Sequence, residues 1–538
     1  MFKPSLAQQG FYDWVQTGEG HAILNAVAGS GKTTTILNGI SMMPGRVWFG
    51  VFNKKMATEI KDKIAERDDD GNAKFPQLLS RGRDLDTTTF HALGMKIWMW
   101  NNKGKSIDVD DRKMKKIVDA MILEREGADQ ERRDDLREMA GMICGIVSMA
   151  KNRGIGFLSD ETDHSVWMDM ITQFDLDGRL PEGVDLDTVI KFSRMALLRS
   201  RKRATDVIDF DDMIYMPLDP TCRAWGYDWV LVDEAQDTNP ARRALASKIL
   251  KRGGRFVAVG DPHQAIYGFT GADNDSLERL RRKFNAVELG LTVTYRCPKA
   301  IVAHAQNWVS HIEAHESAPE GRLTEQPYEE MLETLETLDR ADYSETAILC
   351  RYNKYLVGLC FKMIRMGLPA KIEGRSIGDN LAKLATRWPT VKTVNALETK
   401  LRDYMAKEVE KALQAEKEDK ADRITDEVET LLVLIERVRA NNIGRVSDLV
   451  TEITEMFADN VSDKGLLTLC SCHKSKGMEW DTVYLLDRES LMPSKMASQE
   501  WQLAQEDNLI YVAVTRAKKH LVEVTGVVEE KDPTKGDE

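Results

Sequence analysis

Cysteine is scarce in this sequence, and the cysteines present show no metal-binding spacing. Seven cysteines occur among 538 residues, their number is odd, and no two of them form a C-x-x-C pair. Neither a zinc ribbon nor a disulfide framework is therefore predicted. We expect a reducing, cytosolic setting.

Long hydrophobic runs are absent as well. No apolar stretch reaches the roughly 18 residues that a membrane-spanning helix needs. The N-terminal segment Met-Phe-Lys-Pro-Ser-Leu-Ala-Gln-Gln-Gly lacks the apolar core of a secretion signal. We therefore expect neither a membrane span nor export.

An excess of basic charge is also missing, since the formal net charge is −12. An acidic chain argues at first sight against nucleic acid as a partner. A local basic groove can nevertheless bind phosphates while the remaining surface stays acidic. The net charge therefore does not exclude nucleic acid.

A glycine-rich segment, Ala26-Val-Ala-Gly-Ser-Gly-Lys-Thr33, follows a short apolar run and precedes a predicted helix. A strand, a glycine-rich turn and a helix in this order form a phosphate-binding loop, in which backbone N–H groups point at phosphate oxygens. Lys32 would reach the outer phosphates, and the Thr33 hydroxyl would hold Mg²⁺. The usual G-x-x-x-x-G-K-[ST] pattern begins with glycine, whereas this one begins with Ala26. By itself the segment fits a nucleotide site or a chance glycine-rich turn.

Two carboxylates follow a predicted buried strand at 229–232. Buried carboxylates are costly unless a cation or a proton transfer makes use of them. Asp233 therefore suits a Mg²⁺ ion, and Glu234 suits polarising the water that attacks a γ-phosphate. The alternative is an ordinary acidic loop, and the phosphate loop makes that alternative the weaker one.

Further polar and aromatic residues follow other predicted strands. A strand at 255–260 leads into Asp261 and then Gln264, Tyr267 and Phe269. These two aromatic residues fit ordinary packing or a stacking platform for single-stranded bases.

Two more segments carry polar residues at predicted strand ends. A strand at 46–52 ends in Asn53, and a second such site lies at 87–91, where α/β sheets place ligand contacts. A predicted helix near the N-terminus carries Gln8, whose amide suits reading an adenine edge. A solvated helix start is the alternative for that glutamine.

A second α/β unit is predicted to begin near Leu289. Strands at 345–350, 466–470, 482–486 and 520–525 alternate with helical stretches, which indicates another mostly parallel sheet. The segments 92–204 and 376–462 have helical spacing and high charge, which favours inserted helical lobes. The tail at 529–538 is predicted to be disordered.

In this order, the motifs resemble those of superfamily 1 DNA helicases of the UvrD/Rep type (SF1A). The matching segments are Ala26 to Thr33, Phe52 to Lys54, Thr89 to His91, Val232 to Asp237, Gly260 to Phe269, Thr294 to Arg296, Arg351 with Asn353, His473 to Trp480 and Tyr511 to Ala517. The family form of the phosphate loop is A-G-A-G-S-G-K-T, so Ala26 fits it.

The resemblance implies an α/β fold with two RecA-like domains, parallel sheets and ATP in the cleft between the domains. Each domain would carry a mainly helical insertion. The implied division is 1A at 1–91 and 205–288, 1B at 92–204, 2A at 289–375 and 463–528, and a short 2B at 376–462.

The resemblance also implies roles for individual residues. The implied catalytic residues are Lys32, Asp233, Glu234, Gln264, Arg296 and Arg516. The implied ATP-binding residues are Gln8, Ala28, Gly29, Ser30, Gly31, Lys32, Thr33, Thr34, Tyr295, Gly477 and Glu479. Mg²⁺ would be held by Thr33 and Asp233. The implied DNA-binding residues are Phe52, Asn53, Thr89, His91, Tyr267, Phe269, Arg351, Asn353 and His473.

The sequence departs from the family pattern at three positions. Thr270 replaces an arginine of the coupling motif and cannot supply its cationic contact. Asn508 lies where many relatives carry a basic residue, and Met478 replaces a leucine. The chain is compact for the family, which suggests a phage or other mobile-element origin and a bacterial or phage-infected cytoplasm, and we expect no fused nuclease.

The resemblance implies an ATP-dependent helicase that moves 3′→5′ on single-stranded DNA and acts at junctions with duplex. The alternatives are a translocase that strips proteins from single strands and unwinds little, and a DNA-binding regulator that does not hydrolyse ATP. Intact catalytic positions argue against the regulator. A small-molecule kinase would need neither the paired aromatic residues nor a second nucleotide-facing domain. A monomer is expected, with an oligomer left open.

Overall fold

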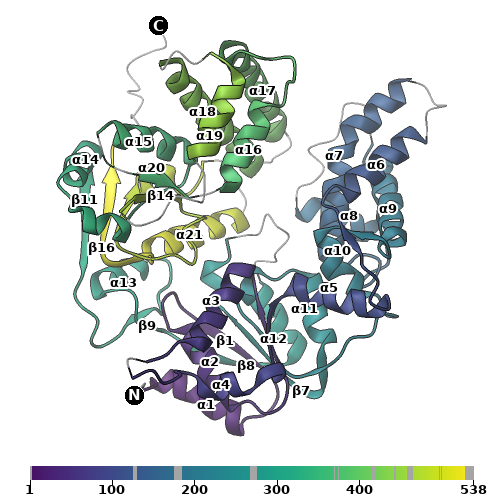
Figure 1. Ribbon diagram of the computed structural model, residues 1–538, viewed down its shortest axis with the longest axis vertical. Helices are drawn as coiled ribbons and strands as arrows, with labels where there is room; N and C mark the ends of the chain where they lie inside the picture. The colour runs from purple at the N-terminus through teal and green to yellow at the C-terminus, as the bar shows by residue number, and fades with distance from the viewer. Residues whose placement is uncertain are drawn as a thin grey trace. The chain divides into compact units, whose positions relative to one another are not determined.

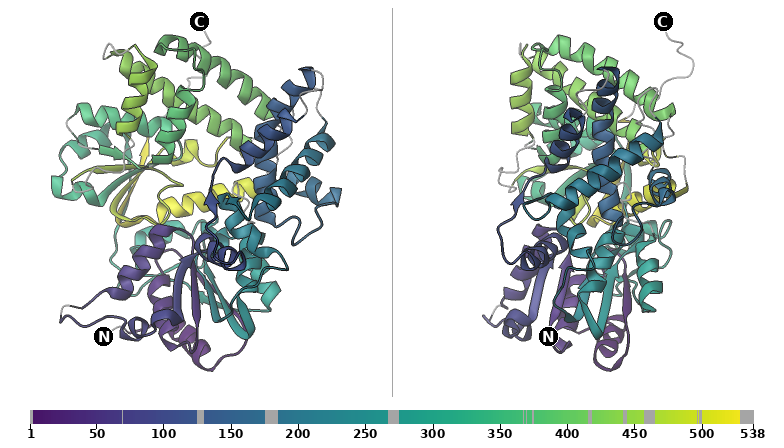
Figure 2. Two further views of the ribbon diagram at one scale, coloured as in Figure 1. Left: turned by 45° about the vertical axis from the view of Figure 1, so that its right-hand side comes forward. Right: turned by 90° about the vertical axis from the view of Figure 1, so that its right-hand side faces the viewer.

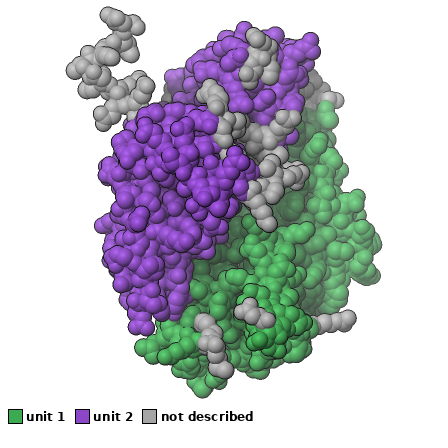
Figure 3. All heavy atoms as spheres, turned by 60° about the vertical axis from the view of Figure 1, so that its left-hand side comes forward, with its two compact units in different colours: residues 1–27, 31–292 green, residues 28–30, 293–538 purple. Residues whose placement is uncertain are grey.

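The computed structural model describes residues 3–68, 70–124, 130–174, 185–266, 275–366, 368, 370–373, 375–414, 418–440, 444–456, 465–495, 497 and 500–527. Contacts divide the chain into two compact units (Figure 3). Unit 1 comprises Met1–Val27 and Gly31–Thr292, and unit 2 comprises Ala28–Ser30 and Val293–Glu538. Three residues of the glycine-rich loop are thus assigned to unit 2.

Unit 1 is built on a six-stranded parallel sheet with the strand order β3-β2-β6-β7-β1-β8 (Figure 1). Its strands are β1 (Ala22–Ala26), β2 (Val47–Val51), β3 (Leu85–Thr89), β6 (Tyr227–Val232), β7 (Leu250–Gly260) and β8 (Val287–Leu291). A separate two-stranded ladder pairs β4 (Asp108–Val109) with β5 (Val207–Ile208). Because all six strands are parallel, their carboxyl ends lie at one edge of the sheet.

Successive strand residues of unit 1 bury their side chains in two separate cores. Leu24 and Phe49 belong to a core with helices α1 (Leu6–Thr17), α2 (Lys32–Met42) and α3 (Lys54–Ala65). Their neighbours Ile23 and Trp48 belong to the other core. This alternation follows from the period of two in a strand, and it explains why these strands are apolar throughout. The second core continues into helices α5 to α9, so the helical segment after β3 shares its interior with the sheet.

Helices α6 to α9 of unit 1 pack against one another, as Figures 1 and 2 show. The helices of this unit are α1 (Leu6–Thr17), α2 (Lys32–Met42), α3 (Lys54–Ala65), α4 (Pro76–Ser80), α5 (Phe90–Asn101), α6 (Lys113–Leu123), α7 (Gln130–Arg153), α8 (His164–Gln173), α9 (Leu186–Arg203), α10 (Phe210–Tyr215), α11 (Pro240–Lys248) and α12 (Ser276–Phe284).

Unit 2 contains a second six-stranded parallel sheet, with the order β11-β16-β15-β12-β14-β13. Its strands are β11 (Arg322–Pro327), β12 (Thr346–Cys350), β13 (Ala370–Ile372), β14 (Leu467–Ser471), β15 (Trp480–Leu486) and β16 (Ala517–Thr525). A short ladder pairs β9 (Val293–Thr294) with β10 (Glu313–Ala314).

Along the chain of unit 2, helices α16 to α19 follow β13 and precede β14. Helices α17 and α18 pack together as a long pair (Figure 1). The helices of this unit are α13 (Lys299–Ala305), α14 (Tyr328–Glu336), α15 (Asn353–Arg365), α16 (Arg375–Ala385), α17 (Val394–Gln414), α18 (Glu418–Ala440), α19 (Val446–Met456), α20 (Arg488–Leu491) and α21 (Glu500–Val514).

The predicted fold class, α/β with two parallel sheets, is confirmed. The structure differs in detail: β7 begins at Leu250, earlier than the predicted 255, and β8 pairs with β1 up to Leu291. The sheet of unit 1 thus extends past residue 289, where the second unit was predicted to begin, and the finer division into four domains stays a prediction. In the part of the chain that is described, no helix combines the length and the apolar character needed to cross a membrane.

Candidate functional site

The glycine-rich loop connects β1 to α2 and has the backbone shape that a phosphate requires. Gly29 and Gly31 have φ of 70° and 75°, in the left-handed region that glycine adopts without strain. Gly31 is the N-cap of α2, so the first N–H groups of this helix are directed toward the loop. The buried Oγ of Ser30 has no hydrogen-bond partner among the described residues. Free donors around an open turn fit a phosphate ligand.

Lys32, the first residue of α2, forms an ion pair with Glu234, which follows β6. Nζ of Lys32 lies 3.1 Å from Oε1 of Glu234. Burial alone would lower the pKa of Lys32, but the carboxylates of Glu234, Asp233 and Asp261 together raise it above its ordinary value. Glu234 itself has φ of 49°, a strained conformation for a side chain of its size. The predicted phosphate-binding and water-activating residues therefore lie side by side.

A buried glutamine that sequence reasoning missed connects Glu234 to the strand-end residues of β7. Nε2 of Gln236 donates to Oε2 of Glu234 at 2.5 Å, and Oε1 of Gln236 accepts from the backbone N of Asp261 at 3.2 Å. Nε2 of Gln264 donates to Oδ2 of Asp261 at 2.7 Å. A continuous polar chain thus runs from Lys32 to the predicted coupling residue. The signal that could have found Gln236 is its place inside the motif Val232 to Asp237, two residues after Glu234.

Gly260, the last residue of β7, makes this chain of contacts sterically feasible. A Cβ at this position would lie 2.2 Å from Oε1 of Gln236, which is closer than nonbonded atoms approach. Any side chain would therefore push Gln236 away from Asp261.

Gln8 lies in the first turn of α1 and is 2% exposed. It forms a capping box with Ser5, in which its Oε1 accepts from the Ser5 N at 3.0 Å. Its Nε2 donates to Oγ1 of Thr35 on α2 at 3.0 Å. Each of these atoms keeps further hydrogen-bonding capacity, since an amide nitrogen has two hydrogens and an amide oxygen two lone pairs. Contact with adenine stays a prediction.

The carboxyl ends of β2 and β3 carry the residues predicted to bind DNA. Asn53 caps α3, accepting from Met56 N at 2.9 Å, and Thr89 caps α5, accepting from Ala92 N at 3.2 Å. Both side chains therefore have a local structural role, and their contact with DNA stays a prediction. Capping at these positions could have been predicted, because asparagine and threonine are preferred N-cap residues.

Phe52 and His91 are both near Arg242, a residue of α11. The guanidinium of Arg242 lies 5.2 Å from the ring centre of Phe52. Burial, together with the charge of Arg242, lowers the pKa of His91 to about 4. The ring of Phe210, which is 53% exposed, lies 6.0 Å from that of His91. The carboxyl ends of β2 and β3 thus bring aromatic rings close to the cation of Arg242. Tyr267, Phe269 and Thr270 lie outside the described residues.

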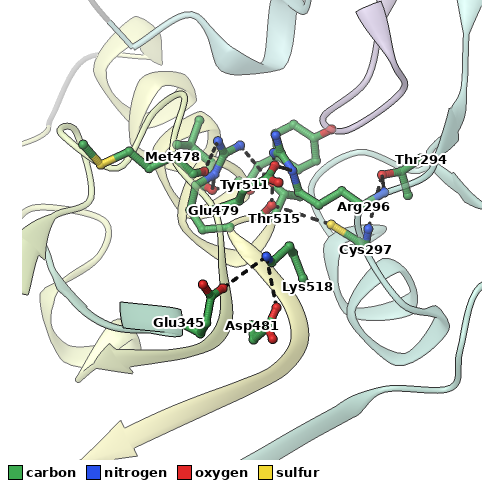
Figure 4. Close-up of polar contacts among 12 residues, drawn as sticks. Thr294, Arg296, Cys297, Glu345, Met478, Glu479, Asp481, Tyr511, Thr515 and Lys518 are labelled. Atoms are coloured by element: carbon green, nitrogen blue, oxygen red, sulfur yellow. Dashed lines mark hydrogen bonds and ion pairs between the residues drawn. The ribbon is translucent and has the colours of Figure 1, made fainter. Parts of the chain in front are cut away.

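In unit 2, Arg296 follows β9 and pairs with Glu479 (Figure 4). Nε of Arg296 donates to Oε2 of Glu479 at 2.6 Å, and the side chain is directed toward the loop before β16. The preceding residue, Tyr295, is 46% exposed, and its ring lies 4.9 Å from that of His315. An exposed ring fits the stacking role predicted for Tyr295. Gly477, in the loop before β15 that also carries Glu479, has φ of 89°.

Arg516 is buried in unit 2, with its guanidinium held by groups of the same unit. Nε donates to Val512 O at 2.7 Å, Nη1 to Met478 O at 3.1 Å and Nη2 to Oγ1 of Thr515 at 3.1 Å. Burial and the nearby charge of Arg296 lower the pKa of Arg516 to about 9, so the guanidinium keeps its charge at neutral pH.

The loop residues assigned to unit 2 contact the same group of side chains. The backbone N of Ala28 donates to Oη of Tyr511 at 3.0 Å, and the N of Tyr295 donates to Gly29 O at 2.9 Å. A Cβ on Gly29 would lie 2.4 Å from Cβ of Arg296. Glycine is therefore required here for close approach as well as for its φ.

Two of the three remaining predicted DNA-binding residues of unit 2, Arg351 and Asn353, are held by carboxylates. Arg351 makes a forked contact with Glu506, with Nη2 to Oε1 at 2.8 Å. Asn353 donates to Asp426 through both its backbone N and its Nδ2. Burial lowers the pKa of His473 to about 3, with a smaller contribution from Arg351, so His473 is neutral at neutral pH.

Metal ligands of the His, Cys, Asp and Glu types do not gather in groups of three or more anywhere in the described ranges. The hydroxyl of Thr33 and the carboxylate of Asp233, which is 6% exposed, are hard oxygen donors of the type that Mg²⁺ prefers.

Residues 11–285 match the model of the UvrD/REP helicase N-terminal domain. The chain belongs to the UvrD/REP helicase family. Residues 382–525 match the UvrD-like helicase C-terminal domain, and this range contains three of the six strands of the second sheet, β14, β15 and β16. The resemblance drawn from the motifs is thereby confirmed.

Relatives in this family align at low identity. The chain is 22% identical to "ATP-dependent DNA helicase PcrA" of Bacillus subtilis over 639 aligned residues, covering 94% of this chain and 81% of that protein. It is 22% identical to "Probable DNA helicase II homolog" of Mycoplasma pneumoniae, covering 94% and 82%. With "ATP-dependent DNA helicase PcrA" of Leuconostoc citreum the identity is 25%, but the match covers 55% of this chain and only 38% of the relative.

Proposed function

We propose that this UvrD/REP family member is an ATP-dependent DNA helicase that moves 3′→5′ along single-stranded DNA. The observation that carries the proposal is the polar chain from Lys32 through Glu234 and Gln236 to Gln264, at the carboxyl edge of a parallel sheet. This edge is where α/β proteins bind ligands. Relatives named as ATP-dependent DNA helicases support it.

ATP with Mg²⁺ is the proposed cofactor of the phosphate loop. The bound ion would neutralise charge on the outer phosphates. Thr33 and Asp233 would hold it, and Lys32 would exchange Glu234 for phosphate oxygens. Glu234, released from Lys32, would then accept a proton from the attacking water.

Arg296 and Arg516 are proposed to stabilise the negative charge on the γ-phosphate. Arginine suits this role because it keeps its charge and offers several donors in one plane. Arg296 now pairs with Glu479, so a γ-phosphate would compete with that carboxylate. Nucleotide states that differ in the γ-phosphate would thus favour different arrangements of Arg296, which is what a motor cycle requires.

The proposed DNA site combines aromatic stacking with few base-specific contacts. Phe52, His91 and Phe210, which lies beside His91, would offer ring faces that accept any base. Sequence-independent stacking is what movement along a strand requires.

Duplexes with a 3′ or a 5′ single-stranded tail test the proposal directly. We expect ATP-dependent unwinding of the 3′-tailed duplex and none by Lys32→Ala, with ATP hydrolysis stimulated by single-stranded DNA. Preference for the 5′ tail would refute the direction. Hydrolysis that does not respond to single-stranded DNA would refute the motor function.

A translocase that displaces proteins and unwinds little is the second candidate. It is favoured by the limited helical segment α16 to α19, which we assign to the predicted 2B insertion. Displacement of streptavidin from a biotinylated single strand, without strand separation on the 3′-tailed duplex, would support this candidate over the helicase.

A further inference from the structure

The first turn of α15 is capped by a carboxylate from a distant helix of the same unit. The backbone N–H groups of Asn353 and Lys354 donate to the two carboxylate oxygens of Asp426, at 3.2 and 2.9 Å. Nδ2 of Asn353 donates to Oδ2 of Asp426 at 2.9 Å. Asp426 lies on α18, which packs along α15. Three donors at the start of one helix thus converge on one anion.

The same helix supplies a second acidic side chain to this turn. Glu429, one turn after Asp426, pairs with the ammonium of Lys354. The positive end of the α15 dipole, two N–H groups, an amide and an ammonium would together suit a phosphate. In the structure, these donors are bound by two carboxylates of α18: Asp426 accepts from the N–H groups and the amide, and Glu429 pairs with the ammonium of Lys354.

Asp426 differs from the other carboxylate that holds a predicted DNA-binding residue. Glu506, the partner of Arg351, is 6% exposed and also accepts from the backbone N of Ser494 at 3.0 Å, so it is fixed within the fold. Asp426 is partly exposed, whereas Glu506 is buried. Burial raises the pKa of Asp426 above its ordinary value, although the hydrogen bonds from Lys354 and Asn353 act in the opposite direction.

We propose that Asp426 acts as an internal competitor for a DNA phosphate at the start of α15. A phosphate and the Asp426 carboxylate cannot both bind the donors at the start of α15, because two negative charges in direct contact repel each other strongly. DNA that binds Asn353 through a phosphate must therefore displace the Asp426 carboxylate. Asp426 weakens DNA binding, because part of the binding free energy is spent on this displacement. This inference rests on the proposed binding of single-stranded DNA.

The test compares Asp426→Asn with the native protein in binding a fluorescent oligo-dT across a range of salt concentrations. We expect the variant to bind more tightly, on the order of threefold to tenfold at low salt, and the slope of log K against log salt to steepen by about 0.7, one more phosphate contact on a single strand. The matched control is Glu436→Gln, which removes one negative charge from the exposed side of α18. Equal effects of the two variants would overturn the inference, since general charge would then explain them.

Two further outcomes separate this inference from the proposed function. A native protein that binds oligo-dT, together with an Asp426→Asn variant that binds no more tightly, overturns the internal competitor alone. A native protein that does not bind oligo-dT at all overturns both. If Asp426→Asn fails to fold, Asp426→Ser keeps a neutral capping oxygen and is measured against the same expectation.

Discussion

Nζ of Lys32 and Oε1 of Glu234 lie 3.1 Å apart, so the two central residues of the candidate ATPase site are each other's partners. Each neutralises the other while no phosphate competes for Lys32. A nucleotide that takes Lys32 also releases the carboxylate of Glu234, which couples phosphate binding to the appearance of a base.

Glu234→Gln tests this coupling. We expect ATP hydrolysis to fall by roughly 10²- to 10⁴-fold, the usual contribution of a general base, while nucleotide binding is retained. Binding should be retained because Lys32 loses a competitor and keeps its charge. Steady-state hydrolysis with single-stranded DNA and fluorescence titration with a labelled ATP measure the two quantities. Glu59→Gln, at an exposed carboxylate of α3, is the control. Surviving turnover in Glu234→Gln would mean that another group activates the water.

Gln236→Ala should reduce turnover more than it weakens ATP binding. The amide of Gln236 orients Glu234 on one side and receives the N–H of Asp261 on the other. Its loss leaves a buried donor unpaired, which costs about 1–3 kcal/mol of folding stability. We expect a lower kcat with KM for ATP within a few-fold of the native value, and a weaker stimulation by DNA. A change in KM alone would show that Gln236 serves nucleotide binding instead of positioning Glu234.

The fold could be predicted largely because its signals are local. Apolar runs of strand length ending in polar residues gave β2, β6 and β12 within one or two residues of their observed bounds. The phosphate loop is likewise one continuous segment. Short ladders such as β9 with β10, and the edge strand β13, carry few residues and little apolar pattern, so nothing local distinguished them from loops.

The partners of the site residues could not be predicted in this way. Asp426 contacts Asn353 across 73 positions of sequence, and Glu506 contacts Arg351 across 155. Acidic residues are frequent in these helices, and only the packing of α18 and α21 selects which carboxylate reaches which donor. The pairing of Gln236 with Asp261 depends on the adjacency of β6 and β7, which the order of strands in the sheet decides.

His91 should make folding stability depend on pH. Its pKa is about 4 in the folded protein against 6.5 for an unperturbed histidine. Between these values the unfolded chain binds more protons, so stability is complete above about pH 6.5 and is lost as pH falls toward 4. We expect the native protein to lose about 2 kcal/mol more than His91→Gln between pH 7 and pH 5. Urea unfolding at a series of pH values measures the difference.

The control for this measurement is His164→Gln, at a histidine whose side chain is 51% exposed. If the native protein and His91→Gln lose stability in parallel, His91 is already accessible to protons in the folded state. That result would also allow a charged His91 to contact DNA phosphate near neutral pH, whereas the buried, neutral ring offers a hydrogen bond or a stacking face.

Arg255 is a residue of β7, and we expect the substitution Arg255→Met to weaken ATP binding. The guanidinium of Arg255 lies 3.9 Å from the ring centre of Trp14 and 4.4 Å from that of Trp229, and it donates to three backbone carbonyls at the end of α1 and in the turn after it. These contacts fasten α1 to the sheet, and α1 carries Gln8. Their loss is expected to cost about 2–4 kcal/mol of folding stability.

A loosened α1 would hold the amide of Gln8 less firmly, so KM for ATP should rise and the preference for ATP over GTP should fall. The kcat at saturating ATP should be nearly unchanged. Arg252→Met, at an exposed arginine of the same strand, should change none of these quantities. A loss of stability with base preference intact would show that α1 is fastened by Arg255 but that Gln8 does not select the base.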